Sequence, residues 1–465
     1  LEMKRRLAGE WEPIKGVMLA WPPFLPHKYI VDLTQNYSVY MCVPNKEEIE
    51  IAKYYLSKWG GNLKNLIFCI APQGFDTPWV RDWGMHPIFD ENGKLFLAGA
   101  EYKMSTPFVS INKPEIMFDC EHNLLTTNSY EQKEDQSQEL IAKQIGLPFM
   151  KLPYALTGGN LMSDGFNKLM SMHILQTENR AKGISDEEFF SMVARDTGMN
   201  EYYIFSNFAN YGLQHIDCYL KIIDEETLLV SRTPKEHYLY ERYEKILEEV
   251  KKVESRYGRQ FKIFRIDIVP FQKDSDELTA YVNSVILNSR VYVPMYGIEQ
   301  DKIAIKQWQN ALPGYEIKGY EFDFEKEPDI IKNRTGYVRT GWGNEDVIHC
   351  RTRAIWDENM LYISVKRLEE IVSENDALEV TIQIVDYSKA GLDYENCRLF
   401  YRYYGFQTWE SIRLEETTEA EIFFANMIGK SGDMIEYFVQ AKSCSGMCET
   451  MPPVAPKGTY KVTIK

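Results

Sequence analysis

One cysteine of the chain has neighbours that could make it a nucleophile. Cys350 follows His349 and precedes two cations, Arg351 and Arg353. Nearby positive charge lowers the pKa of a thiol and enriches the thiolate, which is its reactive form. A lone cysteine is more often a small, inert core residue, but most other cysteines of the chain lack such company. We therefore take Cys350 as the candidate nucleophile.

An imidazole and two carboxylates are candidates to work with this thiol. His215 and Asp217 are two residues apart, so on a strand both would point to the same face. Asp82 lies between two tryptophans, where an apolar and tight setting is expected. Each residue also has an ordinary reading, since His-x-Asp occurs by chance in strands and Asp82 could pair with Arg81. The combination is more informative than any single residue.

A thiol, an imidazole and two carboxylates suit a planar, cationic guanidinium. Two aspartates can each accept paired N–H donors and hold the group flat. Cys350 could then attack the central carbon, and His215 could protonate the leaving ammonia and activate water. An acyl hydrolase would instead need an oxyanion hole, with little acid around the electrophile. The residues therefore predict hydrolytic deimination.

Two other functions stay open at this point. A silent binding protein could hold guanidinium compounds, although binding alone requires no nucleophile. A papain-like hydrolase could use Cys350, His215 and Asn283, but it would leave both aspartates without a role. The sequence has no HExxH, paired CxxC, P-loop or GxGxxG pattern, so neither a metal nor another cofactor is predicted.

Composition narrows the class of protein further. At 465 residues two or three domains are expected. The net charge of −15 argues against a nucleic-acid partner. No stretch approaches 18 consecutive apolar residues, so no membrane span is predicted. Of the eight scattered cysteines only Cys444 and Cys448 are close together, which is compatible with a local disulfide or with two free thiols.

Five amphipathic helical patterns precede residue 357, and each is followed by a short run rich in β-branched and aromatic residues. Ser185 opens one of them as part of a capping box. The helices are expected over Lys46–Trp59, Gln136–Ile145, Ser185–Ala194, Lys235–Tyr257 and Ile298–Leu312. The runs, expected as strands, are Leu66–Ile70, Phe149–Leu152, Tyr202–Phe205, Phe261–Ile268 and Tyr315–Phe322.

Hairpin-like pairs lie before or between these helices, and the recurring order of strand, strand, helix, strand predicts a circular array of ββαβ-type units. In such an array the polar starts of the hairpins would converge on one place. The pairs are Met85–Phe89 with Lys94–Leu97, Cys218–Ile223 with Thr227–Val230, and Val282–Leu287 with Val291–Pro294. The polar starts are Trp79–Gly84, Thr157–Asn160, Gln214–Cys218, Tyr281–Asn283, Gly341–Asn344 and His349–Arg353.

The last hundred residues show a different pattern. Their segments alternate apolar and polar residues, as in an antiparallel sandwich, and no helix longer than Lys366–Val372 is expected. The sequence therefore predicts two domains, an α/β domain over residues 1–357 and a β-sandwich domain over residues 358–465. The strands are expected over Leu378–Val385, Arg398–Tyr404, Glu421–Ala425, Met434–Ala441 and Tyr460–Ile464.

Several motifs together resemble those of the guanidine-modifying enzymes, in the branch of agmatine deiminases and Porphyromonas-type peptidylarginine deiminases. The likeness covers roughly residues 9–357, in order. The motifs are Gly9–Pro13 with Leu19–Pro22, Trp79–Gly84, His215–Asp217 and His349–Arg351. The resemblance implies a five-bladed pseudo-symmetric α/β propeller, here followed by an immunoglobulin-like β-sandwich.

The resemblance also assigns roles at the site. It implies Cys350 as the nucleophile that forms a thiouronium intermediate, His215 as the acid and base, and Asp82 and Asp217 as the guanidinium carboxylates. Asn283 matches the active-site asparagine of the family, and catalysis needs no metal. The residues expected to contact substrate are Trp79, Asp82, Asp217, Gly159 and Asn160.

Two features favour the peptidylarginine branch. Thr157 stands before Gly158-Gly159-Asn160, where agmatine deiminases carry a glutamate, and a further domain follows the cysteine. The expected reaction is peptidyl-arginine to peptidyl-citrulline with release of ammonia. The alternative is agmatine to N-carbamoylputrescine.

Other expectations concern the substrate's end group and the location. In the Porphyromonas-type peptidylarginine deiminases that the chain resembles, a loop with an arginine pair grips the terminal carboxylate of a peptide. The corresponding residues here, 128–133, contain no arginine. A preference for C-terminal arginine is therefore not predicted. The resemblance favours a secreted or cell-surface location, although the chain shows no signal-peptide pattern.

Overall fold

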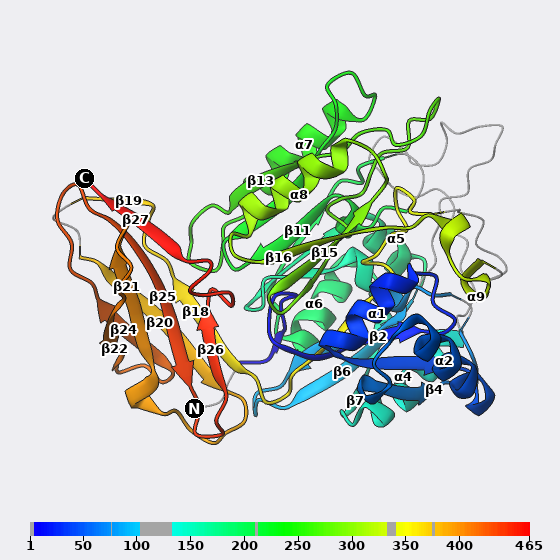
Figure 1. Cartoon of the computed structure of the whole chain (residues 1–465), viewed down its shortest axis with the longest axis horizontal. Coiled ribbons are helices and arrows are strands. Elements are labelled where there is room, and N and C mark those ends of the chain that lie inside the picture. Colours follow the sequence, from blue (N-terminus) through cyan, green and yellow to red (C-terminus); the bar gives the residue numbers. More distant parts are fainter. Residues whose placement is uncertain (1–3, 76, 103–132, 210–212, 333–340, 374–376) are drawn as a thin grey trace.

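The structure is a computed structural model that describes residues 4–75, 77–102, 133–209, 213–332, 341–373 and 377–465. Figure 1 shows a mixed α/β part beside an all-β part, whose orange and red strands lie at the left. Among the described residues no helix is both long and apolar enough to cross a bilayer.

Within the described residues, the α/β part contains five small sheets. One of these sheets joins the beginning and the end of the α/β part, because β17 (Arg353–Trp356) pairs antiparallel with β2 (Ile14–Ala20). β2 continues in parallel to β3 (Ser38–Val43) and β4 (Leu66–Ile70). The segment that carries Cys350 is thereby fixed next to β2.

The other four sheets each contain an antiparallel hairpin joined to a parallel third strand, with helical residues between the second and third strands. One has an extra edge strand, β1 (Arg6–Leu7), beside β5 (His86–Phe89), β6 (Leu95–Glu101) and β7 (Phe149–Ala155). The rest are β8 (Met162–Ser163), β9 (Lys168–Met172), β10 (Glu201–Phe205); β11 (Leu220–Asp224), β12 (Thr227–Arg232), β13 (Lys262–Asp267); and β14 (Val285–Leu287), β15 (Arg290–Met295), β16 (Glu316–Glu321).

The helices cover these sheets with their apolar faces. The described residues contain α1 (His27–Asn36), α2 (Lys46–Trp59), α3 (Val80–Trp83), α4 (Lys133–Ile145), α5 (Ile174–Arg180), α6 (Asp186–Thr197), α7 (Tyr240–Val250), α8 (Gln300–Ala311) and α9 (Asp329–Lys332). Fully buried side chains such as Ala52, Ile141 and Trp308 lie on the inner faces of α2, α4 and α8.

The predicted elements agree with the structure best where a cap marks the helix end. α2 has the predicted bounds, and Ser185 Oγ accepts from the backbone N–H of Glu188 at the start of α6. α7 is much shorter than the predicted Lys235–Tyr257, since turns occupy both ends of that range. α1 and α5 are not predicted, and neither has a side-chain cap.

Two sheets face each other in the all-β part. Their inner side chains, including Val380, Leu399 and Val439, form a separate core. The predicted helical stretch Lys366–Val372 is wrong, because one strand ends at Lys366 and another covers Ile371–Val372. Cys444 and Cys448 are free, exposed thiols. The sheets are β18 (Leu361–Lys366), β20 (Glu379–Asp386), β24 (Ile422–Asn426), β23 (Glu415–Glu416); and β19 (Ile371–Val372), β27 (Tyr460–Ile464), β25 (Met434–Lys442), β21 (Arg398–Tyr403), β22 (Glu410–Arg413), with β26 (Cys448–Met451) on β25.

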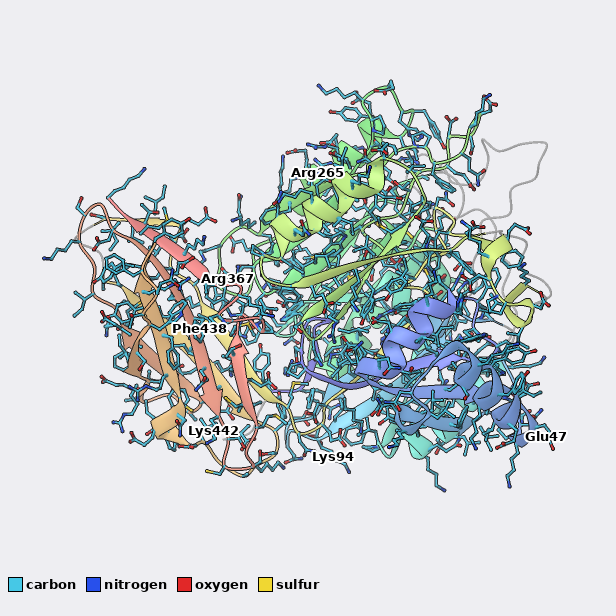
Figure 2. All side chains as sticks on the ribbon, in the orientation of Figure 1. Glu47, Lys94, Arg265, Arg367, Phe438 and Lys442 are labelled. Atoms are coloured by element: carbon cyan, nitrogen blue, oxygen red, sulfur yellow. The ribbon has the colours of Figure 1, made fainter. Side chains whose placement is uncertain are left out.

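Polar side chains connect the two parts. Arg256, after α7, binds the Glu225 carboxylate at 2.8 Å and the Tyr362 hydroxyl of β18 at 2.7 Å. Arg367, which Figure 2 labels at the junction, binds Asp224 at 2.6 Å. The Arg256–Glu225 pair is buried, and such a pair favours one relative arrangement of the two parts, because separating it would leave a buried charge unpaired.

Candidate active site

Cys350 lies just before β17 and is only 1% exposed. The Nδ2 group of Asn283 lies 3.6 Å from Cys350 Sγ, and the Glu345 carbonyl oxygen lies 3.5 Å from the same sulfur. Asn283 also accepts a hydrogen bond from the backbone N–H of His349 at 3.2 Å. The asparagine thus holds both the sulfur and the backbone beside it.

His215, Asp82 and Asp217 surround Gly159. The backbone N–H of Gly159 donates to Asp82 Oδ1 at 3.0 Å, and His215 Nδ1 lies 3.5 Å from the same oxygen. A Cβ atom on Gly159 would lie 2.5 Å from Asp82 Oδ1, 2.8 Å from His215 Nδ1 and 3.2 Å from Asp217 Oδ2. Three predicted residues from two separate segments therefore converge on one glycine of a third segment.

The predicted reason for the pairing of His215 and Asp217 is wrong. Ile216–Cys218 form a 3₁₀ turn, and β11 begins only at Leu220. His215 has extended backbone and the turn follows it, so the two side chains are not placed by strand alternation. Both still lie beside Gly159.

Asn160 holds the backbone around His215. Its Oδ1 accepts from the N–H groups of Met172 at 2.8 Å and Ile216 at 3.1 Å, and its Nδ2 donates to the Met172 carbonyl at 3.1 Å. Trp79, also predicted to contact substrate, donates from Nε1 to Asp346 Oδ1 at 2.9 Å. Substrate contact by either residue remains a prediction.

A buried relay extends from Asp217 away from Gly159. His349 Nδ1 lies 2.7 Å from Asp217 Oδ2, and its Nε2 lies 2.9 Å from Glu10 Oε2. Glu10 also pairs with Lys221 Nζ at 3.1 Å. The sequence assigns His349 no role beyond its place beside Cys350, and the only signal for Glu10 is its place in the Gly9–Pro13 motif.

The two aspartates have pKa values displaced in opposite directions. Burial, and then the charge of Asp217, raise the pKa of Asp82 well above its ordinary value. Burial also opposes ionisation of Asp217, but the hydrogen bond and charge of His349 outweigh it and lower the Asp217 pKa. Such a divided pair is typical of acid–base sites.

The prediction that basic neighbours activate Cys350 is wrong. Arg351 turns toward Asp346, at 2.7 Å, and Arg353 donates to backbone carbonyls. Burial, and then the charges of Asp217 and Asp82, raise the pKa of the Cys350 thiol well above its ordinary value. Burial lowers the pKa of His215 to about 4, so its imidazole is neutral near pH 7.

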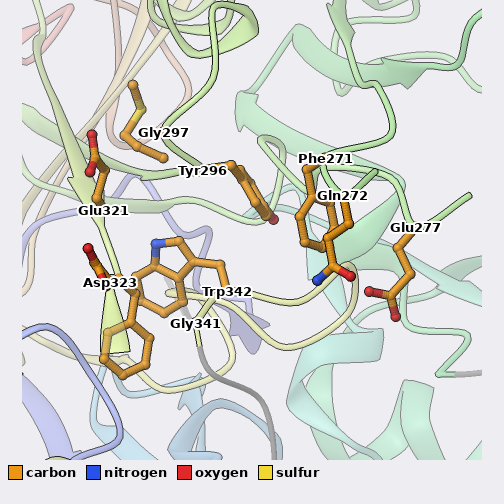
Figure 3. A pocket seen from close by; sticks show the side chains of 11 residues that line it. Phe271, Gln272, Glu277, Tyr296, Gly297, Glu321, Asp323, Gly341 and Trp342 are labelled. Carbon is orange, nitrogen blue, oxygen red and sulfur yellow. The ribbon is translucent and has the colours of Figure 1, made fainter. Parts of the chain in front are cut away.

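A pocket of about 650 Å³ lies where β15 and β16 end, at Met295 and Glu321. Figure 3 shows Tyr296 and Trp342 facing it together with the carboxylates of Glu277, Glu321 and Asp323. Its lining does not include Cys350, His215 or the two site aspartates. However, the Tyr296 hydroxyl donates to the Gly343 carbonyl at 2.7 Å, in the loop that leads to Cys350.

The fold and these converging groups define a class of hydrolases that act on carbon–nitrogen bonds of guanidino groups, the deiminases. Residues 6–323 match the Porphyromonas-type peptidyl-arginine deiminase family, and the chain belongs to this family. Cys350 lies beyond the matched range, so its place in the site comes from the structure.

Agmatine deiminases are among the similar proteins. "Putative agmatine deiminase" of Vibrio parahaemolyticus is 24% identical over 307 residues, which cover 60% of this chain and 76% of that protein. Two solved structures, each covering 76% of this chain and 96% of their own, are agmatine deiminases of Enterococcus faecalis (16% identity, TM-score 0.56) and of C. jejuni (19%, 0.52). At these identities the structures establish the fold.

Proposed function

We propose that this chain converts peptidyl-arginine and water to peptidyl-citrulline and ammonia. The observation that carries the proposal is the convergence of Asp82, Asp217 and His215 on Gly159, with Cys350 held by Asn283 nearby. Family membership supports deimination of a guanidino group. The peptidyl substrate and the covalent step are our own inference.

Substrate binding explains how a thiol with a raised pKa can react. A guanidinium between Asp82 and Asp217 places a positive charge beside the carboxylates whose charges disfavour the Cys350 thiolate. The bound cation therefore lowers the pKa of both Asp82 and Cys350. The nucleophile becomes reactive only when its target is present.

Each covalent step then conserves atoms and charge. The Cys350 thiolate adds to the guanidinium carbon, and His215, carrying the thiol proton, protonates a terminal nitrogen that leaves as ammonia. This leaves a thiouronium intermediate. His215, again neutral, takes a proton from water, and the hydroxide adds to the same carbon. As the carbon–sulfur bond breaks, the hydroxyl proton passes to solvent, where it converts ammonia to ammonium, and citrulline is released. The Cys350 thiolate takes back its proton from His215.

The relay behind Asp217 supports this binding role. His349 donates to Asp217 on one side and faces Glu10 on the other, so Asp217 has a fixed orientation and a lowered pKa. We infer that Asp217 is the carboxylate that is already ionised when the substrate arrives. Asp82 ionises on binding.

We also propose the finer architecture. The recurring hairpin-plus-parallel-strand sheets and the closure of β17 on β2 support a five-bladed pseudo-symmetric propeller for residues 1–357. The two facing sheets support an immunoglobulin-like domain for residues 358–465.

Thr157 and the acidic, aromatic pocket beside Gly343 favour a peptide over agmatine, because the pocket offers room beyond a single guanidino side chain. Agmatine remains the alternative, which the named activities of similar proteins favour. Residues 128–132, in the loop relevant to C-terminal arginine, lie outside the described residues.

The deciding experiment compares ammonia release from a blocked arginine peptide, free arginine and agmatine. We expect the highest kcat/KM for the peptide. A higher value for agmatine would contradict the peptidyl assignment while leaving deimination intact. Cleavage of a peptide bond would favour the papain-like alternative, and tight binding without turnover would favour the silent binding protein.

A further inference from the structure

A small, partly open cavity lies beside Gly158, next to the site residues. Its volume is about 30 Å³, above the roughly 10–15 Å³ that one water-sized occupant requires. Gly158 lines this cavity, whereas the adjacent Gly159 faces the site carboxylates. The charged residues in its wall are Glu10, Arg81 and Arg353.

Two buried guanidinium groups of this wall have unused donors. Arg81 is 3% exposed and Arg353 is 4% exposed. Within the described residues, Arg81 Nη2 and Arg353 Nε have no hydrogen-bond partner. Buried polar groups are nearly always paired with protein or with a bound species. The two donors therefore point to an occupant of the cavity.

The other donors of Arg353 end on neutral acceptors. They contact the carbonyl oxygens of Arg81 at 3.3 Å and Met85 at 3.0 Å, and His86 Nδ1 at 3.3 Å. His86 Nε2 donates to the Leu156 carbonyl, so Nδ1 is the acceptor nitrogen and the ring is neutral. In the described part of the chain, no carboxylate lies within 4 Å of Arg353.

Glu10 does not balance both arginines. Its carboxylate already pairs with Lys221 Nζ at 3.1 Å and contacts His349 at 2.9 Å, while Arg81 Nη1 lies 4.0 Å away. A water molecule would satisfy the free N–H groups, but it would give Arg353, on which Glu10 and Asp82 act only from beyond contact distance, no direct ion pair. A small anion would satisfy both requirements.

We propose that this cavity binds a monovalent halide, with chloride as the physiological occupant, between Arg81 Nη2 and Arg353 Nε. Binding would fix Arg81, whose backbone N–H donates to the Cys350 carbonyl at 3.0 Å and which directly precedes Asp82. The anion would thus stabilise the back of the site without touching the substrate.

The first test is crystallographic. Crystals of the full chain grown with sodium bromide should show an anomalous bromide peak within hydrogen-bond reach of both arginines. A fully occupied water at that position, with no anomalous signal, would overturn the proposal. This test uses the unaltered protein and does not depend on a variant that folds.

The second test is thermal unfolding at constant ionic strength, with chloride replacing gluconate. We expect Tm to rise saturably, by a few degrees at about 100 times the midpoint concentration. The rise should vanish in Arg353→Gln and persist in Arg195→Gln, a control at an exposed arginine. An equal response in wild type and Arg353→Gln would mean a general salt effect and would refute the site.

Discussion

At the scale of single residues, the site depends on charges that oppose each other in a buried space. Asp82 and Asp217 both lie beside Gly159, and Cys350 gains no activation from the arginines next to it. The residue types could be predicted, because few combinations of thiol, imidazole and carboxylates fit one substrate class. The direction of the arginine side chains could not, since it depends on Asp346 and on backbone carbonyls from distant segments.

Gly159→Ala should abolish most activity. The added Cβ would lie 2.5 Å from Asp82 Oδ1 and 2.8 Å from His215 Nδ1, so both groups must move. We expect kcat/KM for a blocked arginine peptide to fall by at least about 10²-fold. Gly61→Ala, remote from the site, serves as the control. Near-normal activity in Gly159→Ala would show that the space beside Gly159 is not used by the substrate.

Asp82→Asn should inactivate the enzyme and stabilise the substrate-free fold. In the wild type, the pKa of Asp82 is higher in the folded state than in the unfolded state. As pH rises above the unfolded pKa of about 3.9, ionisation of this carboxyl favours the unfolded chain and lowers stability. The variant lacks this loss, so its free energy of unfolding at pH 8 should exceed that of wild type.

Urea unfolding of both proteins at pH 5 and pH 8 checks this prediction. The advantage of the variant should be larger at pH 8. A variant less stable than wild type at both values would contradict the raised pKa of Asp82.

At the scale of elements, short connections rather than long helices place the reactive groups. His215 precedes a 3₁₀ turn, and Asp82 lies in the four-residue helix α3. The long helices and most strands could be predicted from their periodicity. These short turns could not, because their backbone is fixed by side chains such as Asn160 from other segments.

Asn160→Ala should therefore lower kcat by roughly 10–10²-fold with little change in KM, because it frees the backbone that positions His215. Steady-state kinetics with a blocked arginine peptide measures both parameters. Asn396→Ala, in the all-β part, is the control. A raised KM with unchanged kcat would instead mean that Asn160 contacts the substrate.

At the scale of the whole molecule, the ends of the α/β part meet and the all-β part packs beside it. A change in periodicity near residue 357 predicts the division into residues 1–357 and 358–465, and these bounds stay a prediction. The pairing of β17 with β2 could not be read from the sequence, because the two strands are more than 300 residues apart and no local pattern sets their register.

Arg256→Met should destabilise the chain by about 3–5 kcal/mol, because it leaves the buried Glu225 carboxylate unpaired at the junction. The midpoint and slope of urea unfolding measure this loss. The double variant Arg256→Met/Glu225→Gln should recover part of it. A loss below about 1 kcal/mol in the single variant would show that the pair does not hold the parts together.

The central claim is that Cys350 carries out deimination. Its most direct test is ammonia and citrulline release from a blocked arginine peptide by wild type and by Cys350→Ser, with circular dichroism to verify the fold. We expect one ammonia per citrulline from wild type, and a rate at least about 10³-fold lower from a folded variant. Undiminished release by the folded variant would contradict the account.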